Sequence, residues 1–215
     1  MGVVLGIDEA GRGCVIGPMV ICGVLADEGA NKLFVQLGVK DSKQLSPGRR
    51  NALRPHILSI IRNYRLVEVE PFEIDQSLAT TGLNVLEAHK MAAMIAHFQP
   101  SKAIVDAPGR GGSYGRLLSH LLPSHIEIVS ENHADKAYPV VSAASILAKL
   151  RRDELIGHLH QEYGDFGSGY SFDKKTIAFL KVWCEKYHTL PECVRSSWKT
   201  VKRLVNMVQR PMFKE

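Results

Sequence analysis

The stretch MGVVLGIDEAGRG, residues 1–13, carries the strongest indication of the fold. An apolar run of strand length leads into two adjacent carboxylates, Asp8 and Glu9, and a glycine-rich turn with one arginine follows. Sheets bury Val, Leu and Ile, and glycine occurs where backbone must come close to another group. Carboxylates at the mouth of a buried strand are costly to desolvate unless a cation or protons neutralise them. The stretch therefore fits a divalent-metal site beside an anion-approaching loop, and it also fits a strand that ends in an ordinary polar turn.

The next part of the chain predicts two more strands and a helix. Residues 18–25 form a second apolar run, and only a short turn separates them from the first strand. A link this short predicts an antiparallel pair, because a parallel crossover needs about a dozen residues or more. Residues 46–63 predict a helix with Ser46 as its N-cap, and residues 65–70 alternate like a half-exposed strand.

Helices and strands alternate in the second half of the chain. The expected helices are residues 83–98, 114–122, 140–163 and 173–187, and the expected strands are residues 103–106 and 126–129. This order predicts an α/β fold with a mixed sheet flanked by helices. Past Pro191 the sequence predicts a basic amphipathic helix, which would be a small C-terminal helical appendage. We therefore divide the chain into a main domain, residues 1–188, and a C-terminal helical extension, residues 189–215.

Composition narrows the class of protein. The 215 residues are 45% hydrophobic and 23% charged, as in an ordinary globular domain. A formal net charge of +5 favours a polyanionic partner without establishing one. No apolar run reaches the roughly 18 residues of a membrane span, and Asp8 and Glu9 interrupt the N-terminal run. We expect no membrane association and a cytoplasmic protein.

Two further carboxylates lie where ligand sites form. Asp106 ends a short apolar strand, and such positions lie at the rim of a buried sheet. Asp135 precedes a helix with a face of small residues, which allows the helix to lie close to the sheet. Taken alone, Asp106 also fits a turn, and Asp135 fits a helix-start acid favoured by the dipole. If both meet Asp8 and Glu9, the four acids would repel unless Mg²⁺ or Mn²⁺ bound them, and two such ions about 4 Å apart serve phosphodiester displacement.

At this point the sequence resembles a known family, the type 2 ribonucleases H (ribonuclease HII). The matching stretches are GIDEAGRG at 6–13, GP at 17–18, DSK at 41–43, VDA at 105–107, AD at 134–135, SAASILAK at 142–149, RD at 152–153 and GY at 169–170. The sequence RSSW at 195–198 is similar to the archaeal-style subgroup more than to the bacterial one. Together the motifs extend over about residues 3–198.

The resemblance implies a fold, an activity and a metal site. Residues 1–188 would be a ribonuclease H-like catalytic domain, and the protein would act as a monomer. Its substrates would be RNA–DNA hybrids, whose RNA strand it hydrolyses, and duplex DNA with single embedded ribonucleotides, which it cuts on the 5′ side. Two-metal-ion catalysis would leave 3′-hydroxyl and 5′-phosphate ends. The catalytic, metal-binding acids would be Asp8, Glu9, Asp106 and Asp135.

The resemblance also implies which residues bind substrate. The backbone of Gly11, Arg12 and Gly13 would contact the ribose 2′-hydroxyl, the group that distinguishes RNA from DNA. Lys43 would meet a phosphate, and Tyr170 would pack on the deoxyribose that follows the ribonucleotide.

Basic and glycine-rich segments outside these motifs have weaker interpretations. We expect Lys149, Arg151 and Arg152 to form a mostly solvated helix face, and residues 109–113 to be a flexible connection. Arg195 and the basic residues 199–203 are candidates to grip the DNA strand. Two other functions stay open: a DNA-cutting nuclease or resolvase with the same acids, and a non-catalytic nucleic-acid-binding module.

Overall fold

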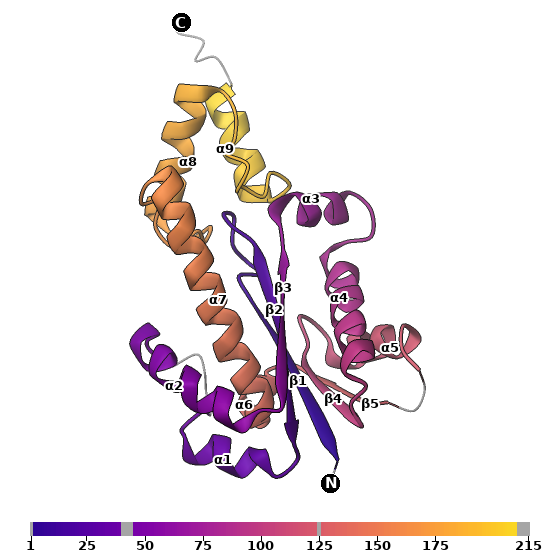
Figure 1. Cartoon of the computed structure of the whole chain (residues 1–215). Helices are drawn as coiled ribbons and strands as arrows, with labels where there is room; N and C mark the ends of the chain where they lie inside the picture. Colours follow the sequence, from indigo (N-terminus) through magenta and orange to yellow (C-terminus); the bar gives the residue numbers. More distant parts are fainter. Residues whose placement is uncertain (1, 40–44, 124–125, 210–215) are drawn as a thin grey trace, which may run out of the picture.

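A mixed sheet forms the centre of the computed structural model, which describes residues 2–39, 45–123 and 126–209 (Figure 1). Its five strands are β1 (Val3–Ala10), β2 (Met19–Asp27), β3 (Asn63–Val69), β4 (Lys102–Asp106) and β5 (Glu127–Glu131), in the order β3-β2-β1-β4-β5. β1 pairs antiparallel with β2 and parallel with β4. The predicted antiparallel pair and the predicted mixed sheet are thereby confirmed. β1 is central, which explains why its apolar residues continue with little polar interruption.

Helices cover both faces of the sheet (Figure 1). They are α1 (Ala30–Gln36), α2 (Pro47–Ile60), α3 (Pro71–Ala79), α4 (Leu83–Phe98), α5 (Gly111–His120), α6 (Ala134–Ala137), α7 (Pro139–Tyr163), α8 (Lys174–Tyr187) and α9 (Lys199–Gln209). The predicted long helices are present within a few residues of their expected ends. The short helices α1, α3 and α6 were not predicted, and the helix expected to reach residue 63 stops at Ile60 because Asn63 opens β3.

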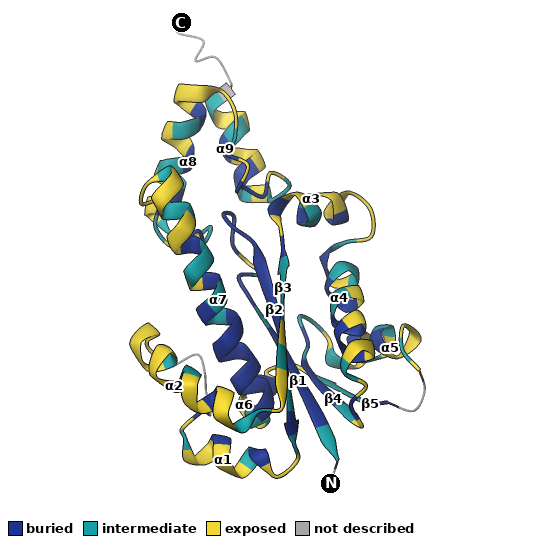
Figure 2. Ribbon diagram, viewed as in Figure 1, coloured by how far each residue is buried: buried dark blue, intermediate teal, exposed yellow. Residues whose placement is uncertain are grey.

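Helix α7 packs against β1 and β2 more closely than a helix with large side chains could. Its first half is mostly buried, as the dark blue ribbon in Figure 2 shows, and includes the small residues Ala143, Ala144 and Ala148. The backbone of Gly6 faces it directly. A methyl group on Gly6 would lie 2.6 Å from the carbonyl carbon of Val140. The predicted close approach of this helix to the sheet is confirmed, and a glycine in β1 makes it possible.

The opposite face of the sheet is covered by α4 and α5. Leu5 and Ile7 of β1 pack there against Met91, Met94 and Ile95 of α4. The segment at residues 109–113 is a correction: it is not simply a flexible connection, because α5 begins at Gly111. A methyl group on Gly111 would lie 2.5 Å from the carbonyl oxygen of Ser130, so this glycine allows α5 to approach β5.

The C-terminal helices extend the molecule beyond the sheet (Figure 1). Val201 and Leu204 of α9 share a buried cluster with Leu180 of α8 and Ile156 of α7. The division at residues 188 and 189 stays a prediction. Within the described ranges, none of the helices has the length and apolar character needed to cross a bilayer.

Candidate active site

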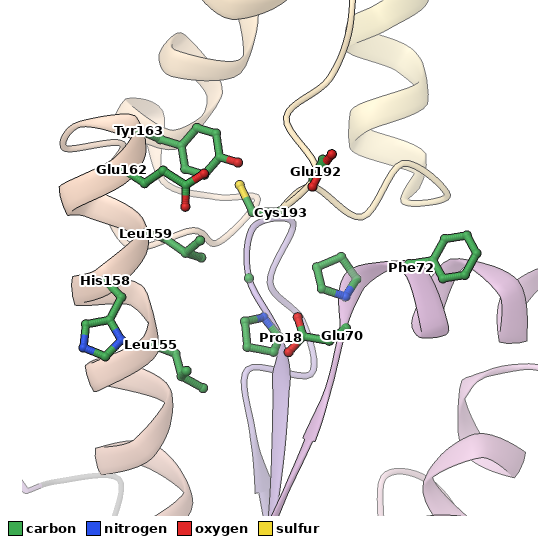
Figure 3. Close-up of a pocket in the computed structure, with 12 residues that line it drawn as sticks. Pro18, Glu70, Phe72, Leu155, His158, Leu159, Glu162, Tyr163, Glu192 and Cys193 are labelled. Atoms are coloured by element: carbon green, nitrogen blue, oxygen red, sulfur yellow. The ribbon is translucent and has the colours of Figure 1, made fainter.

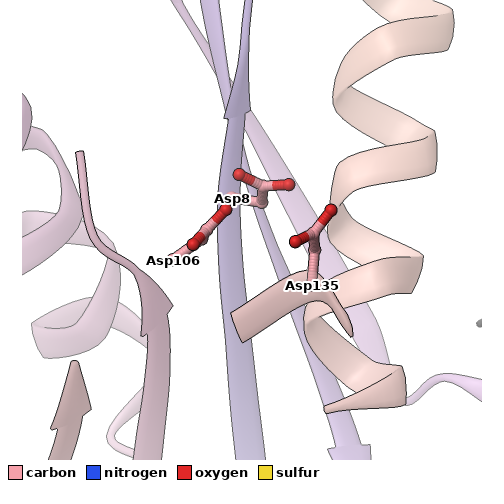
Figure 4. A group of neighbouring side chains, drawn as sticks. All are labelled: Asp8, Asp106 and Asp135. Atoms are coloured by element: carbon pink, nitrogen blue, oxygen red, sulfur yellow. The ribbon is translucent and has the colours of Figure 1, made fainter. Parts of the chain in front are cut away.

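Three carboxylates from separate parts of the chain meet at one edge of the sheet (Figure 4). Asp8 lies near the end of β1, Asp106 is the last residue of β4, and Asp135 belongs to α6. One carboxylate oxygen from each lies within 4.8 Å of those from the other two. β1 and β4 are parallel neighbours, so their carboxyl ends lie at the same edge, where crevices form in such sheets.

Hydrogen bonds hold Asp135 at this edge although it follows a loop. The Asp106 Oδ1 atom accepts a hydrogen bond from the backbone amide of Ala134 at 3.0 Å, next to Asp135 in the chain. The side-chain amide of Asn132 donates to the carbonyl of Ala107 at 3.0 Å. His133 turns the backbone with a φ of 61°, in the left-handed region. These hydrogen bonds hold the loop after β5 against the end of β4, and Asp135 therefore lies close to the other two acids.

The environment of Asp8 opposes a bare negative charge. Its side chain is buried, and burial raises the pKa of Asp8 to about 7, with a further contribution from the charge of Asp106. Ser145 and Lys149 of α7 act the other way, by a hydrogen bond and by charge, and Lys149 Nζ donates to Ser145 Oγ at 2.8 Å. The charge of Lys149 is therefore not enough to bring the pKa of Asp8 back to its usual value.

Glu9 occupies the other face of β1. Side chains alternate along a strand, so Asp8 faces α7 while Glu9 faces the side of α4. Burial raises the pKa of Glu9 well above its usual range, and the neighbouring charges of Asp8, Glu87 and Asp106 raise it further. Its Oε2 atom is buried without a hydrogen-bond partner in the described part of the chain. Glu9 does not belong to the group of three, although it lies close enough to interact with two of its members.

These acids fit a divalent metal. The group offers only carboxylate oxygens, the ligands that Mg²⁺ and Mn²⁺ prefer. Burial disfavours the charged form of Asp8, and one buried oxygen of Glu9 has no hydrogen-bond partner in the described ranges. A bound cation would stabilise both carboxylates.

The glycine-rich loop lies beside Tyr170. Cys14, next to the loop, pairs with Tyr170 as an isolated antiparallel bridge. The amide of Val15 donates to the carbonyl of Gly169 at 2.8 Å. Beneath this junction the guanidinium carbon of Arg152 lies 5.0 Å from the centre of the Tyr170 ring. Arg152 is therefore buried, and its expected place on a solvated helix face is wrong.

The Arg12 side chain is held by hydrogen bonds to α4. Its Nε atom donates to Glu87 Oε1 at 2.8 Å, and Nη2 donates to Asn84 Oδ1 at 2.6 Å. Glu87 is fully buried in α4, and burial raises its pKa to about 7 although Arg12 lowers it. Glu87 lies among ordinary helix residues, so no pattern in the sequence selects it. The backbone of Arg12, rather than its charge, is what the loop can present.

Two further expectations concern basic residues. Lys43 lies outside the described residues. Arg195 was expected on the surface against DNA, and this is wrong, because its side chain is fully buried.

One cavity of the described chain lies away from the acids. It has a volume of about 710 Å³ between α7 and the start of α3 (Figure 3). Its lining contains Glu70, Glu162 and Glu192 and none of the predicted site residues. Because carboxylates repel phosphate, this cavity is poorly suited to a nucleic-acid backbone.

A second cavity, of about 600 Å³, has the opposite character. Trp198, Lys199 and Lys202 contribute to its lining together with Asp75, and Arg12 also borders it although its charge is paired with Glu87. Cations beside an aromatic ring suit a nucleic-acid strand, so the start of α9 offers the better surface for one.

The comparison with protein families decides whether the chain is a nuclease or a non-catalytic nucleic-acid-binding module. A family model described as ribonuclease HII matches residues 5–201. The chain belongs to the ribonuclease HII family. A ribonuclease HII of Pyrococcus furiosus is 42% identical over 207 residues, which are 95% of this chain and 92% of that protein.

Solved structures of ribonuclease HII agree with this assignment. The ribonuclease H2 of Pyrococcus horikoshii superimposes with a TM-score of 0.89 at 38% identity, over 97% of this chain and 99% of that one. The ribonuclease HII of Archaeoglobus fulgidus, solved in a complex with PCNA, gives a TM-score of 0.85 at 40% identity, over 94% and 96%. The predicted ribonuclease H-like fold is confirmed. As a ribonuclease HII, the chain is a metal-dependent endonuclease that hydrolyses the RNA strand of RNA–DNA hybrids.

Proposed function

We propose that this ribonuclease HII also cuts duplex DNA 5′ to a single embedded ribonucleotide and leaves 3′-hydroxyl and 5′-phosphate ends. The main support is the position of the loop at residues 11–13, which follows directly on the strand that holds Asp8. A sugar bound at that loop would place its neighbouring phosphate toward the carboxylates.

We further propose that Asp8, Glu9, Asp106 and Asp135 together hold Mg²⁺ or Mn²⁺. Asp8, Asp106 and Asp135 converge within 4.8 Å, and Glu9 contributes a buried oxygen without a partner in the described ranges. When bound, two such cations would supply Lewis acidity to the attacking water and to the leaving oxygen. The chain itself orients these acids through the amide of Ala134 and excludes water from Asp8 by burial.

Recognition of the ribose would use the loop and Tyr170. Glycine at positions 11 and 13 lets the backbone amides approach the 2′-hydroxyl, which only the ribonucleotide carries. Tyr170 would pack on the next deoxyribose, with Arg152 behind its ring. Lys43, by its motif, would meet a phosphate.

Three duplexes test the proposed incision: one with a single ribonucleotide, one with an RNA strand, and one of DNA only. Each is incubated with Mg²⁺, with Mn²⁺ or with EDTA, and the cut position and end groups are mapped. We expect metal-dependent cleavage 5′ to the ribonucleotide, and no cutting of the DNA-only duplex. Cleavage confined to runs of ribonucleotides would contradict the single-ribonucleotide part of the proposal. Cutting in EDTA would contradict the proposed metal-dependent site.

Tyr170 provides a second prediction. Tyr170→Ala should lower kcat/KM on the single-ribonucleotide duplex about 10- to 100-fold, because packing on the sugar positions the phosphate. Tyr170→Phe keeps the ring over Arg152 and should remain within about threefold of the parent. Steady-state kinetics on the three proteins measures both values. Equal losses in the two variants would assign the effect to the hydroxyl group instead of the ring.

A further inference from the structure

A buried arginine from the C-terminal part of the chain contacts the glycine-rich loop. The Arg195 side chain has no exposed surface, and each of its three nitrogen atoms donates to a backbone carbonyl oxygen. Nη2 donates to Gly11 at 2.8 Å and to Gly17 at 2.8 Å, Nη1 donates to Arg12 at 2.9 Å, and Nε donates to Gly17 at 3.0 Å. One guanidinium thus binds the beginning and the end of the turn that follows β1.

The contacts with Gly11 and Arg12 fix the direction of two amides. A trans peptide is planar, and its N–H points away from its C=O. The carbonyl of Gly11 shares its peptide with the amide of Arg12, and the carbonyl of Arg12 shares its peptide with the amide of Gly13. Because Arg195 holds both carbonyls on its own side, both amides point to the opposite side.

The loop leaves room for a ligand at Gly13. Gly13 is exposed, and a methyl group built on it would meet nothing within 4 Å. Within the described residues neither the Arg12 amide nor the Gly13 amide donates a hydrogen bond. Two parallel donors without a protein acceptor suit a ligand oxygen.

The charge of Arg195 adds to this effect. Burial lowers the pKa of Arg195 to about 10, so the side chain stays protonated at neutral pH. No carboxylate forms an ion pair with it in the described part of the chain, so the carbonyls receive its charge directly. A charge-assisted hydrogen bond at a carbonyl polarises the whole peptide and strengthens its N–H as a donor.

We propose that Arg195 is a positioning residue for ribose recognition: it holds the two peptides of Gly11-Arg12-Gly13 with their amides toward the substrate and strengthens them as donors. The proposal rests on the proposed role of this loop in binding the 2′-hydroxyl. It makes ribonucleotide recognition depend on a residue that never touches the substrate.

A second contact keeps the arginine in place. Asp75 of α3 accepts hydrogen bonds from the amide of Ser196 at 2.7 Å and the amide of Ser197 at 3.1 Å, and from both hydroxyl groups. The guanidinium carbon of Arg195 also lies 5.2 Å from the centre of the Trp198 ring. The segment after Val194 is thereby fixed to α3 while Arg195 reaches the loop.

Arg195→Lys is the decisive variant, because lysine keeps the charge but cannot bind three carbonyls with a planar fork. On the single-ribonucleotide duplex we expect kcat/KM to fall about 10- to 100-fold. The inhibition constant of a DNA-only duplex, which has no 2′-hydroxyl at the site, should stay within about threefold. Arg54→Lys makes the same chemical change at an exposed pair with Glu154 and should leave both values unchanged.

Several outcomes would overturn the proposal or separate it from the proposed function. If Arg195→Lys folds and keeps its kcat/KM, or weakens DNA-only binding as much as it lowers kcat/KM, Arg195 does not position the amides. If the parent protein fails to cut the single-ribonucleotide duplex, the proposed function is wrong instead. Should Arg195→Lys lack a cooperative unfolding transition, Asp75→Asn decides: a drop in kcat/KM of about 3- to 10-fold with unchanged DNA-only inhibition is expected, and no drop overturns the proposal.

Discussion

Asp106→Asn is expected to lower the rate of hybrid cleavage at least about a thousandfold while hybrid affinity stays within about threefold. Asparagine retains an oxygen that can accept the Ala134 amide, so the turn before α6 keeps its hydrogen bond. What is lost is one negative charge among the three carboxylates that meet within 4.8 Å. Single-turnover cleavage and equilibrium binding of one hybrid measure the two quantities separately.

The control is a carboxylate outside the cluster. Glu127→Gln removes a charge from the neighbouring strand β5, where Glu127 pairs with Lys102 at the surface. It should cleave at the parent rate. Near-normal turnover in Asp106→Asn would refute the assigned site, and a comparable loss in Glu127→Gln would show that any lost carboxylate near the sheet impairs the enzyme.

Asp8→Asn tests the same site through protein stability, a measurement that needs no substrate. Burial, with help from Asp106, raises the pKa of Asp8 from 3.8 to about 7. A carboxyl with a raised pKa stabilises the fold while it is protonated, so this contribution is complete below pH 4 and is lost as pH rises through about 7. In EDTA the free energy of unfolding of the parent protein should therefore fall across this window relative to Asp8→Asn, by about 2–4 kcal/mol. Added Mg²⁺ should stabilise the parent more than the variant.

The positions of Asp8 and Asp106 could be predicted from the sequence, because the end of an apolar run marks the end of a strand. Asp8 and Asp106 each follow an apolar run, and parallel strands place such ends together. Asp135 could not be placed in this way, because it follows a loop and lies at the start of a helix. Its prediction depended on the family motifs at residues 134–135 and 142–149. The hydrogen bond from Ala134 to Asp106 that fixes it joins residues 28 positions apart, and no local pattern encodes it.

Long-range partners explain what the sequence could not reveal. Glu87 and Arg12 are 75 positions apart, and Arg195 lies 184 positions from Gly11. An arginine in a basic segment is ordinarily a surface cation, so the sequence alone makes Arg195 a candidate for contact with DNA. Burial is possible here because backbone carbonyls replace water around the guanidinium, and which carbonyls converge depends on the folded turn. The need for glycine at position 111 is likewise not visible in the local sequence, because it comes from the nearby backbone of Ser130 in β5.

Gly6→Ala is expected to destabilise the protein by about 2–4 kcal/mol and to reduce cleavage with it. The added methyl group would lie 2.6 Å from the carbonyl carbon of Val140 and 2.7 Å from the amide nitrogen of Val141. Both atoms are backbone, so no side-chain rotation relieves the clash, and α7 must move away from β1. Ser145, which hydrogen-bonds Asp8, would move with the helix. Urea unfolding and hybrid cleavage measure the two losses.

Gly157 in the same helix is the matched control. A methyl group there would meet nothing within 4 Å, and its position is exposed. Because alanine favours a helix interior over glycine, Gly157→Ala should stabilise the protein by about 0.5–1 kcal/mol and leave cleavage unchanged. Opposite signs for the same glycine-to-alanine change would show that the contact between β1 and α7, not glycine content, sets the stability. If Gly6→Ala is as stable as the parent, α7 does not need to lie against a bare strand backbone, and the close approach is not what holds Ser145 beside Asp8.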